Sequence, residues 1–336
     1  MDSKLKVGIG LGVIVLLTAG GGYFLLKPGN DTPEFVMQSV EKSITAHDKK
    51  EFYKLVDIDS VLNTSYDEIV EGLADSDKSM SIEAREAVKN FTQMLKSPLI
   101  ISLKSAIDSY VETGEFQEPE NLGMKDFLNR TGIDKIEFRA IENIEINPAN
   151  DKEAVADIKI FQSELGKDFV LKTVLNKNDS GEWRVVSLQN FKDFVMLIGE
   201  VRRDQLNNYL SKTEEINSIH DKTIRDAEQK YSSILALGSL GQENTRSDLK
   251  NLMLDVIKKD WEVRKQEFFN LQVPQGAETL HNLRLKICDL EISYAEEYAQ
   301  WMSDKKAATI KSAEEKRRQA QTLMTEANVL ARRMSN

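Results

Sequence analysis

The side chains that could perform chemistry in this sequence are few and widely separated. Histidine is the usual general base and metal ligand near neutral pH, and the chain has three, His47, His220 and His281. His47 precedes Asp48, whose carboxylate could orient an imidazole, although an exposed loop position is the simpler expectation. His220 and His281 fall in different predicted helices, and no second metal-ligating side chain lies three or four residues from His220. The histidines therefore predict neither a metal site nor a general base.

The acidic pairs and the single thiol add little chemistry. Asp57 and Asp59 could offer two carboxylates to a cation, but a turn or a helix cap explains them equally well. Cys288 is the only cysteine, which excludes an internal disulfide and a paired-cysteine zinc site, and its core-like neighbours predict a buried, unreactive thiol. Nucleophile-elbow, P-loop and zinc motifs are also missing from the sequence. We therefore expect no catalytic, cofactor-binding or metal-binding residue, and a protein that is not an enzyme.

The elements that would position these residues begin with an apolar segment at residues 7–26, which runs without a charge from Val7 to Leu26. About 20 apolar residues in a helix span the hydrocarbon core of a bilayer. Residues 1–27 are therefore predicted to be a cytoplasmic tip and a single transmembrane anchor that contacts the lipid bilayer of the cell membrane. The lysines around the segment favour an extracytoplasmic body. Alternatively, the segment is a signal peptide cut near Ala19, and the protein is secreted.

The composition bounds what the rest of the chain can be. The chain has 336 residues and a net charge of −10, and 30% of its residues are charged. After the anchor, enough residues remain for two domains. Because nucleic-acid binders show a basic footprint, this acidity argues against nucleic acid as a partner.

Residues 28–32 are predicted to be a linker, and residues 33–192 an α+β domain with a helical insert at about 64–130. Thr32 and Pro33 have the residue types of an N-cap and of a first helical position. Ala46, His47 and Asp48 are predicted to break the helix that follows, before a second short helix. Further helices are expected at residues 67–73, 82–95 and 98–111, with polar loops at 75–80 and 115–123.

The periodicity then changes from helical spacing to alternation of apolar and polar residues. Turn clusters such as NKNDSG separate the alternating segments, which are residues 136–146, 154–162, 167–175 and 182–188. Four short strands joined by tight turns predict an antiparallel meander, because parallel pairing would need longer crossovers. A sheet this small needs cover on one face, which the preceding helices can supply.

Two stretches of this domain share features with a known family. The first is TPEFVMQSVEKSITAHDKKEFYKLVDID and the second is GEWRVVSLQNF, in which Pro33, Asp48, Phe52, Asp57 and Trp183 carry the likeness. They resemble nuclear transport factor 2-like domains and related membrane-anchored bacterial proteins of unknown function. The resemblance covers about residues 32–192 and implies a cone-shaped α+β core into which Trp183 packs. Such domains include enzymes, ligand carriers and protein-binding modules, so the resemblance implies no single function.

Residues 193–336 contain few turn-forming residues and are predicted to be a bundle of long helices. GSLG and VPQG interrupt them, which gives helices at about 190–236, 243–271 and 276–334. Apolar residues recur in steps of three and four along the first and last helices, at Ile216, Ile219, Ile224, Ala227, Tyr231 and Ile234, and at Leu280, Leu283, Ile287, Leu290, Tyr294 and Trp301. Short loops favour a three-helix antiparallel, coiled-coil-like bundle. The stripes are either its core or a seam for a protein partner or a second copy.

The expected fold class is therefore α+β, with an N-terminal transmembrane helix, helices on a small antiparallel sheet, and a long-helix antiparallel bundle. The expected function is that of a non-catalytic binding or scaffold module of the cell envelope. Two alternatives stay open. The α+β pocket could hold a small apolar ligand or perform simple acid–base chemistry, or the body could face the cytoplasm and regulate a membrane complex.

Overall fold

The computed structural model describes residues 31–76, 81–114 and 129–335 of the chain. The predicted anchor at residues 7–26, most of the predicted linker and the loop expected at 115–123 lie outside the described residues. Among the helices that are described, none combines the length and apolar character needed to cross a membrane. The chain divides between Val201 and Arg202 into two compact units, each of which is described by itself below.

The first unit opens with two short helices, the first of which begins at the N-cap that the sequence predicts. Helix α2, Pro33–Thr45, starts with the Thr32 hydroxyl accepting a hydrogen bond from the Phe35 backbone N–H at 3.2 Å. The predicted break follows at His47, whose φ of 56° interrupts the helical path. Asp48 then caps helix α3, Lys49–Leu55, by accepting from the Glu51 N–H at 2.9 Å.

Two longer helices follow, α4, Ile58–Ser76, and α5, Ile82–Thr113. The prediction of separate helices at 82–95 and 98–111 is wrong, because α5 passes through Pro98 unbroken. Proline costs about 3 kcal/mol inside a helix. Leu99, Leu103 and Ile107 continue the buried face of α5 beyond Pro98, and their burial offsets that cost.

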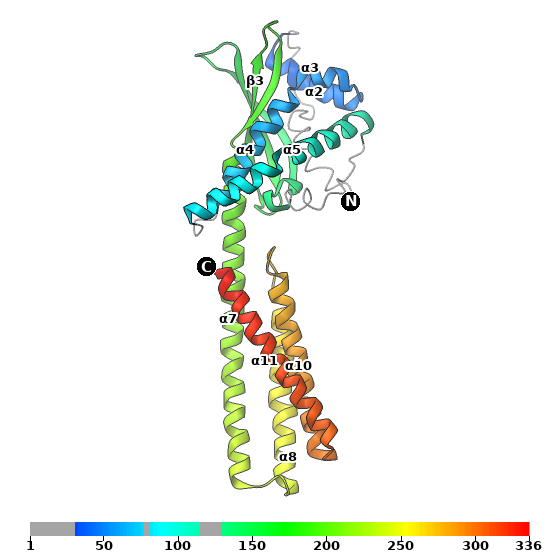
Figure 1. Ribbon diagram of the computed structural model, residues 1–336, viewed down its shortest axis with the longest axis vertical. Helices are drawn as coiled ribbons and strands as arrows, with labels where there is room; N and C mark the ends of the chain where they lie inside the picture. The colour runs from blue at the N-terminus through cyan, green and yellow to red at the C-terminus, as the bar shows by residue number, and fades with distance from the viewer. Residues whose placement is uncertain (1–30, 77–80, 115–128, 336) are drawn as a thin grey trace. The chain divides into compact units, whose positions relative to one another are not determined.

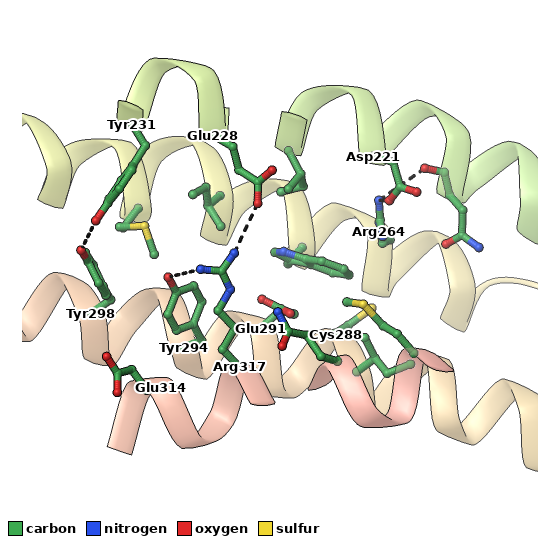
Figure 2. A pocket seen from close by; sticks show the side chains of 18 of the residues that line it. Asp221, Glu228, Tyr231, Arg264, Cys288, Glu291, Tyr294, Tyr298, Glu314 and Arg317 are labelled. Atoms are coloured by element: carbon green, nitrogen blue, oxygen red, sulfur yellow. Dashed lines mark hydrogen bonds and ion pairs between the residues drawn. The ribbon is translucent and has the colours of Figure 1, made fainter. Parts of the chain in front are cut away.

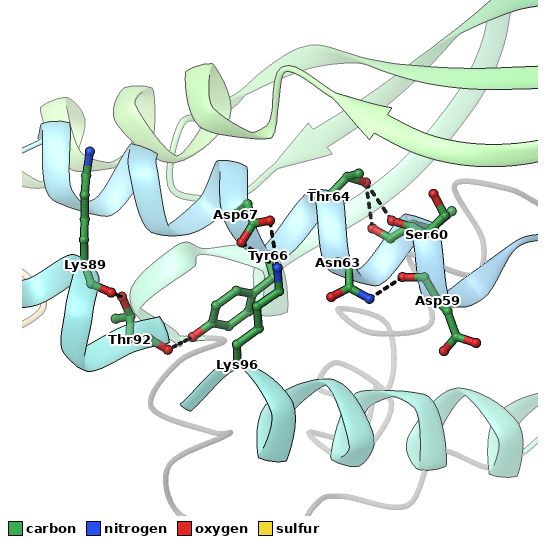
Figure 3. A network of polar contacts seen from close by, with 10 residues as sticks. Asp59, Ser60, Asn63, Thr64, Tyr66, Asp67, Lys89, Thr92 and Lys96 are labelled. Carbon is green, nitrogen blue, oxygen red and sulfur yellow. Dashed lines mark hydrogen bonds and ion pairs between the residues drawn. The ribbon is translucent and has the colours of Figure 1, made fainter. Parts of the chain in front are cut away.

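Polar contacts join α4 to the first half of α5 (Figure 3). The Tyr66 hydroxyl donates to the Thr92 backbone carbonyl at 2.6 Å, and Lys96 donates to both carboxylate oxygens of Asp67 at 2.7 Å. Tyr66 itself is buried in the core. Its hydroxyl therefore satisfies a backbone group of the neighbouring helix while its ring packs beneath it.

The four predicted strands form the predicted antiparallel meander, in the order β1-β2-β3-β4 (Figure 1). Their bounds are Ile136–Ile146, Glu153–Gln162, Lys167–Lys177 and Trp183–Gln189. Buried and half-buried residues alternate along β2, with Ala156, Ile158 and Ile160 inside. The segment between α3 and α4 is hydrogen-bonded to strand β4, because the Asp57 N–H donates to the Val185 carbonyl at 2.8 Å.

The space between this sheet and its helices is filled by the unit's own side chains. Phe52, Tyr66, Phe191 and Phe194 are among the largest fully buried residues, and they belong to one hydrophobic cluster. Trp183 is buried in the same cluster, as the family resemblance implies. The described part of this unit is thus a helix-covered antiparallel sheet with a packed core.

The second unit consists of long helices. Helix α7 is Phe191–Leu237, of which the part from Arg202 belongs to this unit. It is followed by a rod of three consecutive segments, α8, Glu243–Leu252, the π-helix η2, Met253–Lys258, and α9, Lys259–Phe269. Two further helices, α10, Glu278–Asp304, and α11, Ala307–Ser335, complete the unit. These elements confirm the first two predicted long helices to within a few residues.

The prediction of one helix over 276–334 is wrong, because the chain turns at Lys305. This residue adopts φ 53°, the left-handed conformation that ends α10, and its N–H donates to the Trp301 carbonyl at 2.9 Å. The Asp304 carboxylate then accepts from the Lys306 N–H at 2.9 Å and the Thr309 hydroxyl at 2.9 Å. Asp304 therefore caps the start of α11 without any glycine or proline in the turn. The unit is a bundle of four helical rods rather than the expected three.

The predicted apolar stripes are only partly buried. Ala227, Leu280 and Ile287 lie inside the bundle, but Ile219 is 59% exposed. The buried face of α10 is rotated toward residues between the predicted positions, including Arg284, Cys288 and Glu291. On α11 the buried residues are alanines at heptad spacing, Ala313, Ala320 and Ala327. Polar and small side chains thus occupy many core positions of the bundle.

Candidate functional site

A cleft of about 830 Å³ runs along the interior of the helical unit (Figure 2). It is lined by side chains at steps of three and four on three helices, which is the spacing of an inward-facing stripe. These side chains are Asn217, Asp221, Ile224, Glu228 and Tyr231 on α7, Arg284, Ile287, Glu291, Tyr294, Tyr298 and Trp301 on α10, and Ile310, Glu314, Arg317, Gln321, Met324 and Asn328 on α11. The cleft therefore lies along the inward faces of these helices, beside the buried core of the unit.

The remaining wall of the cleft is supplied by the rod that contains the π-helix. Met253 and Ile257 of η2 and Trp261, Arg264 and Phe268 of α9 line it. A π-helix has poorer hydrogen-bond geometry than an α-helix and occurs frequently at functional sites. Here two of the six residues of η2, Met253 and Ile257, line the cleft, so the irregular turn borders the open space.

Aromatic rings form one end of the cleft. Tyr298 contacts Tyr294 and Trp301, with ring centroids 5.7 Å and 5.4 Å away. Its hydroxyl lies 2.5 Å from the hydroxyl of Tyr231, so this pair links α10 to α7 across the cleft. Burial and the Tyr231 contact raise the pKa of Tyr298, which keeps the phenol neutral. The end is thus an apolar wall with hydroxyl groups at its rim.

Two arginines of the cleft are neutralised by acids on α7 (Figure 2). Arg264 donates to Asp221 at 2.5 Å, and its guanidinium stacks on Trp261 at 4.2 Å from the ring centroid. Arg317 lies 3.3 Å from Glu228 and donates to the Tyr294 hydroxyl at 3.4 Å. Long polar side chains therefore join α7 to α9 and α11, in addition to the apolar contacts of α7 with the core.

Two other ionisable residues of the cleft, Glu291 and Arg284, form no ion pair with a described residue, although Tyr209 accepts a hydrogen bond from Arg284. Glu291 is 7% exposed and makes no hydrogen bond or ion pair with any described residue. Burial raises its pKa to about 7, although Arg317 and Arg264 oppose the rise. Arg284 is 8% exposed, and its Nη1 atom is buried without a hydrogen-bond partner in the described part of the chain. Burial lowers the pKa of Arg284. Unsatisfied buried polar groups are costly and need a physical explanation.

Cys288 lies in the wall of the same cleft and is buried, as predicted. Desolvation raises the pKa of its thiol to about 12. The thiolate, which is the reactive form, is therefore scarce at neutral pH. The predicted burial of Cys288 is thus confirmed, and its low reactivity stays a prediction.

The structure brings His220 together with two carboxylates that its sequence neighbours do not reveal. His220 Nδ1 lies 2.8 Å from Asp260, and Nε2 lies 3.0 Å from Glu267. Both acids come from the α9 rod, 40 and 47 residues away in sequence. Their spacing of seven places them on one helix face, which is the signal that could have suggested a shared partner. His281 lies elsewhere, with Nδ1 3.3 Å from the Tyr209 hydroxyl.

The other candidate residues do not assemble a site. His47 is exposed, and its Nδ1 lies 3.1 Å from the Val111 carbonyl, while Asp48 serves as a helix cap. Asp57 accepts from the Ser60 N–H at 3.1 Å, whereas Asp59 pairs with Lys104, so the two acids act separately. Among the described residues, no group of three or more His, Cys, Asp or Glu side chains could hold a metal ion.

Comparisons with known proteins identify no relative of this chain. No family model, curated protein or solved structure matches it. The resemblance to nuclear transport factor 2-like domains therefore stays a prediction, and the chemistry of the cleft has to be argued from its own residues.

Proposed function

We propose that this chain is a non-catalytic binding protein whose ligand occupies the four-helix cleft. The observation that carries the proposal is an open space beside the buried core of the unit, lined by aromatic rings and by Glu291 and Arg284, two buried ionisable groups that form no ion pair with a described residue. Bundles commonly build ligand sites from side chains on facing helices. A concave space with apolar walls and a few convergent polar groups is the usual form of such a site.

The proposal also includes a membrane anchor and a surface for a protein partner. We propose that residues 7–26 anchor the chain in the cell membrane and keep the binding unit near the bilayer. Deleting residues 1–30 should move the protein from the membrane fraction to the soluble fraction. The C-terminal helices remain the proposed surface for a protein partner or a second copy. The packed core of the α+β unit offers no observation that favours a ligand there over the cleft.

Binding can be tested with anilinonaphthalene sulfonate, an aromatic probe that fluoresces in apolar surroundings. The full chain should bind it saturably, with quenching of Trp261 or Trp301, which line the cleft. Gln321 is an exposed residue of the lining, so Gln321→Phe should fill part of the cleft and abolish saturable binding.

The matched control is Gln319→Phe, which changes an exposed residue of the same helix outside the lining. It should leave probe binding unchanged. Equal binding by both variants would place the probe elsewhere and would remove the proposal.

A further inference from the structure

Arg284 is a buried cation at one end of the cleft that no acid neutralises. Of the three arginines in the lining, Arg264 and Arg317 each form an ion pair with a carboxylate of α7. Among the described residues, Arg284 forms none. Glu214 is the acid whose charge acts on it, but only from beyond ion-pair distance.

Two aromatic rings fix the position of this guanidinium. Its central carbon lies 5.8 Å from the Tyr209 ring centroid and 5.7 Å from that of Phe268. Cation–π contacts of this kind stabilise the charge by about 0.5–2 kcal/mol. The Tyr209 side chain also accepts a hydrogen bond from the guanidinium, but Nη1 is left buried and unpartnered within the described structure. The site is therefore positively charged and lacks an acceptor for Nη1.

The rest of the cleft shows what kind of molecule could bring that acceptor. Arg284 and Trp301 are 17 residues apart on α10, which corresponds to about 25 Å at about 1.5 Å per residue. Between them apolar side chains such as Ile257, Trp261 and Ile287 alternate with Glu291 and with the two paired arginines. An elongated molecule whose apolar part packs on the apolar side chains thus fits along the helices, with its polar end at Arg284.

We infer that the ligand is an anionic amphiphile whose carboxylate or phosphate head is held by Arg284 while its apolar chain lies along the cleft. The inference rests on the proposed function. A planar guanidinium presents parallel N–H donors to such an oxyanion, and charge-assisted hydrogen bonds are the strong ones. Each buried methylene adds about 0.8 kcal/mol, so affinity should rise with chain length.

The experiment compares four probes that share one chain and differ in the head: decanoate, decyl phosphate, 1-decanol and decyltrimethylammonium. Each is titrated into the full chain below its micellar concentration, by calorimetry or by displacement of anilinonaphthalene sulfonate. A hydrogen bond to a charged group contributes about 1.5–3 kcal/mol. The affinity of an anionic probe should therefore exceed that of 1-decanol by at least about tenfold. The two anionic probes separate a carboxylate head from a phosphate head.

Variants of Arg284 assign the preference to one residue. Arg284→Met should bind decanoate and 1-decanol equally, whereas Arg284→Lys should keep part of the preference because it keeps the charge. Arg225→Met removes an exposed arginine of α7 that does not line the cleft, and it should behave like the unchanged chain. The head-group series on the unchanged chain does not depend on whether the variants fold.

The outcomes separate the two proposals. If 1-decanol or decyltrimethylammonium binds as tightly as the anionic probes, the cleft binds apolar chains and the anionic head is refuted. The same holds if Arg284→Met retains the preference. If no probe binds saturably, the binding function itself fails.

Discussion

The replacement Glu291→Gln tests the electrostatics of the cleft most directly. Glu291 is 7% exposed, lies on α10, and faces Glu228 of α7, Arg264 of α9 and Arg317 of α11. Removal from water disfavours its charged form more than the two arginines favour it, which raises its pKa from 4.5 to about 7. A glutamine of the same shape is neutral at every pH.

The direction in which stability changes with pH follows from proton linkage. Between pH 4.5 and about 7 the folded state holds a proton on Glu291 that the unfolded state has released. Stability therefore falls as pH rises through this window and is constant with respect to Glu291 above it. At about 1.4 kcal/mol per pH unit, the full loss is about 3 kcal/mol. The glutamine variant should therefore be more stable than the unchanged chain at pH 8, by up to about 3 kcal/mol, and close to it at pH 4.5.

Urea unfolding of the full chain at pH 5, 6, 7 and 8 measures this difference, and tryptophan fluorescence reports the helical unit because two of the three tryptophans lie there. Glu314→Gln is the matched control, since Glu314 lines the same cleft but is exposed. A constant difference between Glu291→Gln and the unchanged chain at all four pH values would refute the reasoning. So would a Glu291 carboxyl that titrates below pH 5 by carbon-13 NMR.

Three further outcomes test other parts of the structure. Lys305→Gly should stabilise the chain by about 1 kcal/mol in urea unfolding, because glycine adopts the left-handed conformation without a Cβ clash, and a loss of stability would contradict the turn. Tyr66→Phe should cost about 1 kcal/mol, since it removes the hydrogen bond that the Tyr66 hydroxyl donates to the Thr92 carbonyl, and a neutral result would deny that bond. Cys288 should resist a thiol-specific disulfide reagent at pH 8 until the chain is unfolded, and rapid native labelling would exclude its burial.

Local signals in the sequence predicted the sheet and the helix starts well. Alternation and turn clusters placed all four strands within two residues of their ends, and Thr32 with Pro33 marked the start of α2. The strand ends and the start of α2 are determined by residues that are close together in the sequence. The path through Pro98 and the turn at Lys305 were missed because tertiary burial and a side-chain cap decide them. Pro98 had indicated a helix break, and the absence of glycine and proline around Lys305 had indicated a continuous helix.

The cleft could not be predicted from the apolar pattern. The heptad interpretation selected Ile219 and Leu283 and passed over Arg284 and Glu291, because it assumes that core positions are apolar. The available signal for the cleft was a pair of charged residues seven apart on one helix face, Asp221 and Glu228. Reading them as a buried stripe requires knowing that an opposing helix carries their partners, and Arg264 and Arg317 come from distant parts of the sequence.

The alanine row on α11 has a consequence for how the cleft could be redesigned. Ala313, Ala320 and Ala327 are buried at heptad spacing, and small side chains allow α11 to lie close against α10, its main neighbour. The row therefore affects how closely α11 approaches α10 beside the cleft, whose lining includes Ala327. Substituting serine would change the distance between α10 and α11 little, whereas valine would increase it by a fraction of the length of a side chain. A graded series at Ala320, which does not itself line the cleft, would thus tune the size of guest admitted while leaving every contacting group unchanged.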